Sequence, residues 1–124
     1  MSKNFAETYE DLDVYQKAFV CSLEIHKVSQ DFPKSEQYAL ADQARRASKS
    51  VCANLAEGFI KQRGSKAEFK RFILMALGSA GEMLVWIEYC RELSYVDKEL
   101  AKKWKEDYTT ICKMLQALHS SIKP

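Results

Sequence analysis

Glycine and proline are scarce in this chain, which has four glycines and two prolines among its 124 residues. Both residue types break helices and build turns, so their scarcity favours a helical fold over a turn-rich β fold. No window approaches the roughly 20 apolar residues of a membrane span, and the first residues contain no apolar core of signal-peptide length. We therefore expect a cytoplasmic protein that is not attached to a membrane.

The residue types that usually carry chemistry are few and unsuitably spaced. The four cysteines (Cys21, Cys52, Cys90 and Cys112) form no C-x-x-C pair and have no histidine at zinc-finger spacing. This favours buried free thiols, with a metal site or disulfides as the alternatives. Neither histidine has a glutamate three residues before it, as the di-metal sites of four-helix bundles require. We expect no catalytic residue, metal or cofactor, and therefore a protein that is not an enzyme.

Apolar residues recur at helical spacing in four segments: about 11–32, 36–60, 66–93 and 97–121. The loops between these segments are short, which favours antiparallel neighbours. We therefore predict an all-α fold, an antiparallel up-down-up-down four-helix bundle over residues 10–124. Residues 1–9 show no periodicity and are predicted to form a flexible N-terminal arm.

Three polar residues stand at positions suited to helix N-caps. Ser35 follows the break at Pro33 and is expected to cap the second helix. Ser65 and Glu68 have the spacing of a capping box before the third helix. Asp97 is expected to cap the fourth.

The first helix carries more apolar surface than one bundle seam can use. One stripe contains Leu12, Tyr15, Phe19, Leu23 and His26, and the other contains Val14, Ala18, Cys21, Ile25, Val28 and Phe32. At 100° per residue the centres of the two stripes lie roughly 140° apart. Either this helix is deeply buried, or the second of the two stripes packs on another subunit.

Gly78 and Gly81 interrupt the apolar third helix. Each costs about 1 kcal/mol relative to alanine in a helix interior. We expect that this cost is offset by close contact with another helix.

A polar stripe follows the second helix beside its apolar face. Five residues spaced three or four apart share this stripe, and two residues of the third helix are placed to complete it across the seam: Gln43, Arg46, Ser50, Asn54 and Glu57, with Ser79 and Glu82. We predict a buried structural network that fixes the register of the helices. A subunit contact and a ligand-binding or catalytic role are the alternatives.

Basic charge is concentrated in the middle of the chain. Residues 45–71 contain eight basic and two acidic residues, a net charge of +6, whereas the rest of the chain carries −4. Such a segment is either a solvated face or a surface that contacts phosphates without reading bases. The residues predicted to bind RNA or DNA are Arg45, Lys49, Lys61, Arg63, Lys66, Lys70 and Arg71.

Residues 43–58 form a distinctive segment that reads Q-A-R-R-A-S-K-S-V-C-A-N-L-A-E-G. This segment resembles the pattern Q-x-R-R-A-x-x-S-I-x-x-N-I-A-E-G of the four-helix-bundle proteins encoded in 23S rRNA intervening sequences. Residues 11–15, 32–40 and 68–82 also match the family's opening D-L-x-V-W/Y, its F-P-x-x-E-x-Y-x-L segment and its E-F-x-x-F-L-x-x-A-x-G-S-x-x-E segment. Gly81 and the fourth helix depart mildly from the pattern.

The resemblance implies a bundle that assembles into a homo-oligomeric ring, typically a pentamer, of unestablished function. The family is similar to the accessory protein of diversity-generating retroelements, a basic ring that binds nucleic acid and a reverse transcriptase. The expected partners are therefore the chain itself, RNA or DNA and, by analogy, a nucleic-acid enzyme. The alternatives are a structural or protein-interaction oligomer that does not bind nucleic acid and, less favoured, a small enzyme.

Overall fold

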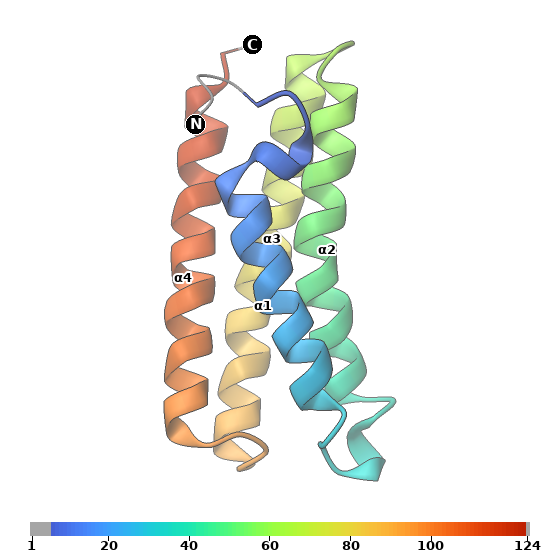
Figure 1. Cartoon of the computed structure of the whole chain (residues 1–124), viewed down its shortest axis with the longest axis vertical. Helices are drawn as coiled ribbons and strands as arrows, with labels where there is room; N and C mark the ends of the chain where they lie inside the picture. The colour runs from blue at the N-terminus through green and yellow to red at the C-terminus, as the bar shows by residue number, and fades with distance from the viewer. Residues whose placement is uncertain (1–5, 124) are drawn as a thin grey trace.

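Four antiparallel helices form the molecule. The computed structural model describes residues 6–123. It consists of η1 (Tyr9–Asp11), α1 (Asp13–Ser29), η2 (Lys34–Glu36), α2 (Leu40–Lys61), α3 (Lys66–Glu92) and α4 (Lys98–Ser121), where η marks a short 3-10 helix. Figure 1 shows that the chain reverses direction from each α-helix to the next. The predicted all-α, up-down-up-down four-helix bundle is confirmed.

The helices stand at the corners of a four-sided bundle. α2 and α4 each pack against both α1 and α3, whereas α1 and α3 lie diagonally across the bundle, with no Cα atoms within 8 Å of each other. Figure 1 accordingly shows α1 in front and α3 behind, with α2 and α4 at the sides. The outer surfaces of α1 and α3 therefore face in opposite directions.

The connection between α1 and α2 differs most from the sequence prediction. α1 ends at Ser29, and α2 begins at Leu40 rather than at residue 36. Ser35 lies inside η2 and does not act as the cap; the Glu36 carboxylate instead accepts the Leu40 N–H at 3.3 Å. The Gln37 amide donates to the carbonyls of Ser29 and Phe32 at 3.0 and 2.9 Å, which satisfies orphan acceptors at the end of α1. Contacts across the loop thus set both helix ends.

The other two caps follow the sequence more closely. The Ser65 hydroxyl accepts the Glu68 N–H at 3.2 Å, and the Asp97 carboxylate accepts the Leu100 N–H at 2.8 Å. The Glu68 carboxylate binds the Arg71 guanidinium at 2.8 Å, so Glu68 is engaged within α3 and not in the reciprocal half of a capping box. Residues 1–5 of the predicted arm lie outside the described residues, and the domain boundary after residue 9 stays a prediction.

The core is built from large side chains on α4 and small ones on α2. Trp104 and Tyr108 of α4 are almost fully buried, as are Ala41, Ala44 and Ala47 of α2. At Gly58, a Cβ atom would lie 2.5 Å from the Phe72 Cβ on α3, well inside van der Waals contact. The small residues therefore permit the close approach of α2 and α3.

The cysteines belong to the same interior. Cys21, Cys52 and Cys90 are buried free thiols, and Cys112 is half-buried. Burial raises the pKa of each of the first three to about 11, because it penalises the thiolate. They are packing residues and not nucleophiles at neutral pH.

We expect Gly58→Ala to lower the free energy of unfolding by about 1–3 kcal/mol, since the new methyl group must displace Phe72. Thermal and urea unfolding followed by circular dichroism measure this loss. The matched control is Gly64→Ala, whose Cβ would have only the Lys61 carbonyl nearby, at 3.8 Å. Equal stability of the two variants would contradict the close approach of α2 and α3.

Candidate assembly and nucleic-acid surfaces

A short polar contact joins the middle of α2 to α3. The Ser79 hydroxyl of α3 donates to the Ser50 hydroxyl of α2 at 2.9 Å. The Asn54 amide donates to the same hydroxyl at 3.0 Å and to the Ser50 carbonyl at 2.9 Å. All three residues are partly buried. This part of the predicted polar network exists within one chain and fixes the register of the two helices.

The charged residues of the predicted network do not join it within one chain. Arg46 pairs with Asp42 at 2.8 Å, and its side chain is 76% exposed. Glu57 pairs with Lys61 at 2.8 Å and is 52% exposed. The Glu82 carboxylate accepts the Trp86 indole N–H at 3.0 Å on its own helix, and Gln43 is exposed. The prediction that these residues are buried within one chain was therefore wrong. Their role as a subunit contact stays a prediction.

The partners of the three charged side chains explain why the network does not form within one chain. Each charged side chain finds a partner four residues away on its own helix, the spacing at which helical neighbours meet. Exposed pairs of this kind contribute little to stability. The structure therefore supports no large loss of stability in Glu57→Ala, contrary to what a buried network would require.

Two of the residues predicted to bind nucleic acid have structural partners. The Arg45 guanidinium donates to the Ser29 hydroxyl at 2.8 Å and to the Gln37 amide oxygen at 2.7 Å, and so holds the α1–α2 loop. The Lys70 ammonium donates to the His119 and Ile122 carbonyls at 3.1 and 2.8 Å. Lys70 thus caps the C-terminal end of α4, where a cation is favoured by the helix dipole.

Two further cations enclose an aromatic ring. The Lys61 ammonium and the Arg71 guanidinium each lie 4.7 Å from the centre of the Phe72 ring. Lys61 also pairs with Glu57, and Arg71 with Glu68. Their charge is therefore partly neutralised, and their side chains are held against the bundle.

The remaining three predicted residues are available for a ligand. The side chains of Arg63 and Lys49 are exposed and form no hydrogen bond or ion pair within residues 6–123, and the Lys66 side chain binds only the Gln62 amide oxygen, at 3.2 Å. Lys49 lies twelve residues before Lys61 on α2, about 18 Å away along the helix. The basic segment is therefore not one patch. Its free charge is concentrated at the α2–α3 loop, with Lys49 separate.

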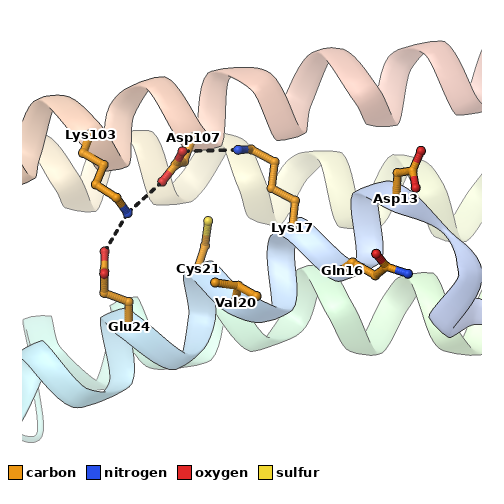
Figure 2. A pocket seen from close by; sticks show the side chains of 8 residues that line it. All are labelled: Asp13, Gln16, Lys17, Val20, Cys21, Glu24, Lys103 and Asp107. Atoms are coloured by element: carbon orange, nitrogen blue, oxygen red, sulfur yellow. Dashed lines mark hydrogen bonds and ion pairs between the residues drawn. The ribbon is translucent and has the colours of Figure 1, made fainter.

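A charged groove that no sequence pattern indicated lies between α1 and α4 (Figure 2). The groove has a volume of about 490 Å³ and contains Asp13, Gln16, Lys17, Val20, Cys21, Glu24, Lys103 and Asp107. Asp107 pairs with Lys17 and Lys103, each at 3.3 Å, and Lys103 pairs with Glu24 at 3.0 Å. The two lysines neutralise Asp107 and Glu24 in this chain of ion pairs, and Asp13 leaves the groove with a net charge of −1. It joins the two helices electrostatically.

Glu24 anchors this chain of charges to the core. Its carboxylate accepts the indole N–H of the buried Trp104 at 2.6 Å. This hydrogen bond is the main reason that the pKa of Glu24 lies below its usual value, and the Lys103 ammonium lowers it further. A sequence pattern could not reveal the contact, because the two residues are 80 positions apart.

Apolar side chains remain exposed on the outer faces of α1 and α3. Phe19, Val20 and Leu23 form the outer face of α1. The stripe left at the surface is thus the one that contains Phe19 and Leu23, while most of the other stripe is buried. The corresponding outer face of α3 contains Leu74, Met75, Val85, Tyr89 and Leu93.

The two interior glycines of α3 also face outward. A Cβ atom at Gly78 or Gly81 would have no atom of another helix within 4 Å. The expected close helix contact is therefore absent within the chain.

α3 is also long and apolar enough to cross a membrane by length and composition, with a third of the apolar window buried in the bundle. This corrects the expectation that no segment approaches that composition.

The sequence and the fold both match known proteins. The sequence profile of the family described as 23S rRNA-intervening sequence protein matches residues 10–117. The chain belongs to this family. The predicted relationship is thus confirmed, and the match covers all four helices except the last residues of α4.

A protein of known crystal structure shows the same fold. It is a protein of unknown function from the S23 ribosomal protein family of Bacteroides thetaiotaomicron VPI-5482. It has 24% sequence identity to this chain and a TM-score of 0.77, over 86% of this chain and 95% of that one. No match was found among curated proteins. These comparisons show the family of the chain and do not show an activity.

We expect Glu24→Gln to remove a pH-dependent part of the stability while leaving the contact with Trp104 sterically possible. Because the pKa of Glu24 is lowered in the folded chain, its charge stabilises the fold above the ordinary carboxyl pKa, about 4.3. This contribution disappears as the pH falls through the lowered value. The Tm difference between wild type and variant should therefore be largest near neutral pH and shrink in acid.

The control for this measurement is Glu106→Gln on the exposed surface of α4. It should show a smaller Tm difference at neutral pH. A Glu24→Gln variant whose Tm matches that of wild type at every pH would mean that the charge chain does not stabilise the α1–α4 seam.

Proposed function

We propose that this protein is a non-catalytic subunit of a homo-oligomeric ring that binds RNA or DNA through a basic surface. The observation that carries the proposal is the pair of exposed apolar faces on α1 and α3. Exposed apolar patches of this kind mark interaction sites. Their placement at opposite corners of the bundle supports a particular kind of assembly.

A contact between the α3 face of one copy and the α1 face of the next is head-to-tail. Such heterologous contacts form a ring when the rotation between copies closes, whereas a two-fold dimer would pair like faces and leave the others exposed. The family resemblance given by residues 43–58 favours five subunits. A closed ring covers both faces of every copy.

The outward glycines of α3 are consistent with this arrangement. Their helix-propensity cost of about 1 kcal/mol each is not offset inside the bundle, where no neighbour approaches them. A helix of another copy can approach the bare backbone closely at Gly78 and Gly81. The large side chains of Phe19 and Leu23 on α1 supply matching apolar surface.

The free cations at the α2–α3 loop support the second half of the proposal. Arg63 and Lys66 have no acidic partner within the described residues, and a ring repeats them around its axis. Contacts made by such side chains are directed to phosphates and tolerate any base sequence. The alternative function, an oligomer that does not bind nucleic acid, predicts the same assembly without this binding.

We expect the double substitution Gly78→Leu and Gly81→Leu to break the ring while preserving the helical bundle. Inside one chain the new side chains meet open space and improve helix propensity, but they obstruct a helix of another copy. Light scattering after size-exclusion chromatography measures the mass, and circular dichroism measures the helix content.

Ala117→Leu is the control, since Ala117 is also exposed but lies on α4, outside the apolar faces of α1 and α3. Assembly should survive in this variant. A wild-type monomer at micromolar concentration would refute the ring. An oligomer that persists in the double variant would place the contact elsewhere on the molecule.

We expect Arg63→Glu with Lys66→Glu to weaken binding to single-stranded RNA or DNA. Removal of one phosphate contact should reduce the slope of log affinity against log salt by about 0.7. Fluorescence anisotropy over a salt series measures both quantities. Reversal of the exposed residues Lys27 and Lys34 changes the net charge equally and serves as the control.

The two variants separate a local surface from a general charge effect. Equal weakening in both would mean that only net charge matters. Absence of binding by wild type at low salt would favour the alternative function, provided that the oligomer is intact.

A further inference from the structure

A second groove, between α3 and α4, differs from the first in its charge. It has a volume of about 430 Å³. Its apolar part includes Leu84 and Val85 of α3 and the buried Ala101 of α4. Its charged part contains four cations and one acid: Arg91, Lys98, Lys102 and Lys105, with Glu88. The groove therefore combines an apolar floor with a strongly basic rim.

The three lysines of the rim are unpaired. Lys98, Lys102 and Lys105 are exposed and form no ion pair within residues 6–123. Their neighbour Lys103 points to the other side of α4 and pairs with Glu24 and Asp107. Arg91 pairs with the adjacent Glu92 at 2.9 Å. The unpaired charge of the groove thus comes mainly from the α4 side.

The lysines also form a regular row. They are spaced four and three residues apart, so they lie on one face of α4 and cover about 10 Å of its length. A helix laid along the groove presents its own side chains at the same spacing. Helices that dock into grooves make their contacts through residues at i, i+3 or i+4, and i+7.

We propose that this groove binds an acidic amphipathic helix of a partner protein. The apolar stripe of that helix would cover Leu84, Val85 and Ala101, and acidic residues beside the stripe would face the lysine row. The positive rim steers such a partner and fixes its orientation, while burial of the floor supplies affinity. This interaction is independent of nucleic-acid binding and goes beyond the proposed function.

Two other occupants fit the groove less well. A nucleic-acid backbone is attracted by the lysines, but phosphate contacts require no apolar floor. A second copy of the chain lacks the required helix, because no segment of the sequence has three acidic residues at i, i+3 or i+4, and i+7. Val85 is shared with the outer face of α3, so the groove opens at the edge of the surface assigned to assembly.

The test uses a short peptide held helical by a hydrocarbon staple, with three glutamates spaced four and three residues apart beside a leucine stripe. A matched peptide has glutamines in place of the glutamates. Fluorescence anisotropy measures the binding of each peptide to the full chain at low salt. Wild type should bind the glutamate peptide more tightly than the glutamine peptide.

Two variants then locate the site. Simultaneous reversal of Lys98, Lys102 and Lys105 to glutamate should raise the Kd of the glutamate peptide by about tenfold or more. Leu84→Ala should also weaken this binding, since it removes part of the apolar floor and leaves the outer face of α3 unchanged. The control is reversal of three exposed lysines elsewhere, Lys27→Glu, Lys34→Glu and Lys123→Glu, which leaves the groove unchanged.

Each remaining outcome overturns the proposal. Equal binding of the two peptides would show that the lysine row does not recognise acids. Equal weakening in the control variant would show a general charge effect. A single-stranded oligonucleotide that needs the same three lysines, with no binding of the glutamate peptide, would identify the groove as part of the nucleic-acid surface. Circular dichroism establishes that every variant is folded.

Discussion

The close approach of α2 and α3 is the constraint on which the rest of the molecule depends. Gly58 lies against Phe72, and the Ser50 and Ser79 hydroxyls meet further along the same seam. α4 packs against α3 and places Trp104 in the core. α1 completes the bundle diagonally across from α3. That diagonal placement leaves the outer faces of α1 and α3 pointing away from each other. The proposed head-to-tail assembly requires this arrangement.

Much of the charge in this protein maintains the fold. Arg45 holds the α1–α2 loop, Lys70 caps α4, and Lys103 connects α4 to α1. Cations that remain free are found at the α2–α3 loop and along α4. The net charge of a segment is therefore a poor guide to a binding surface, because it counts these structural cations equally with the free ones.

Sequence patterns predicted the start of a helix correctly where neighbouring residues determine it. α3 and α4 begin within one residue of their predicted starts, since Ser65 and Asp97 cap them through adjacent backbone. The start of α2 was misplaced because the Glu36 carboxylate, which also accepts the hydroxyl of the distant Tyr95, takes the place of Ser35 at the helix start. The candidate surfaces were harder to predict: residues 72–124 carry no net charge, and only the fold separates Lys103 from its unpaired neighbours.

The distribution of cysteines has a practical consequence for studying motion in this bundle. Each helix carries one thiol, three of them buried and Cys112 half-buried. A thiol-specific reagent can modify a buried cysteine only when its surroundings open. The modification rates of Cys21, Cys52 and Cys90 therefore record how often α1, α2 and α3 separate from their neighbours, and the half-buried Cys112 of α4 gives a rate to compare with them.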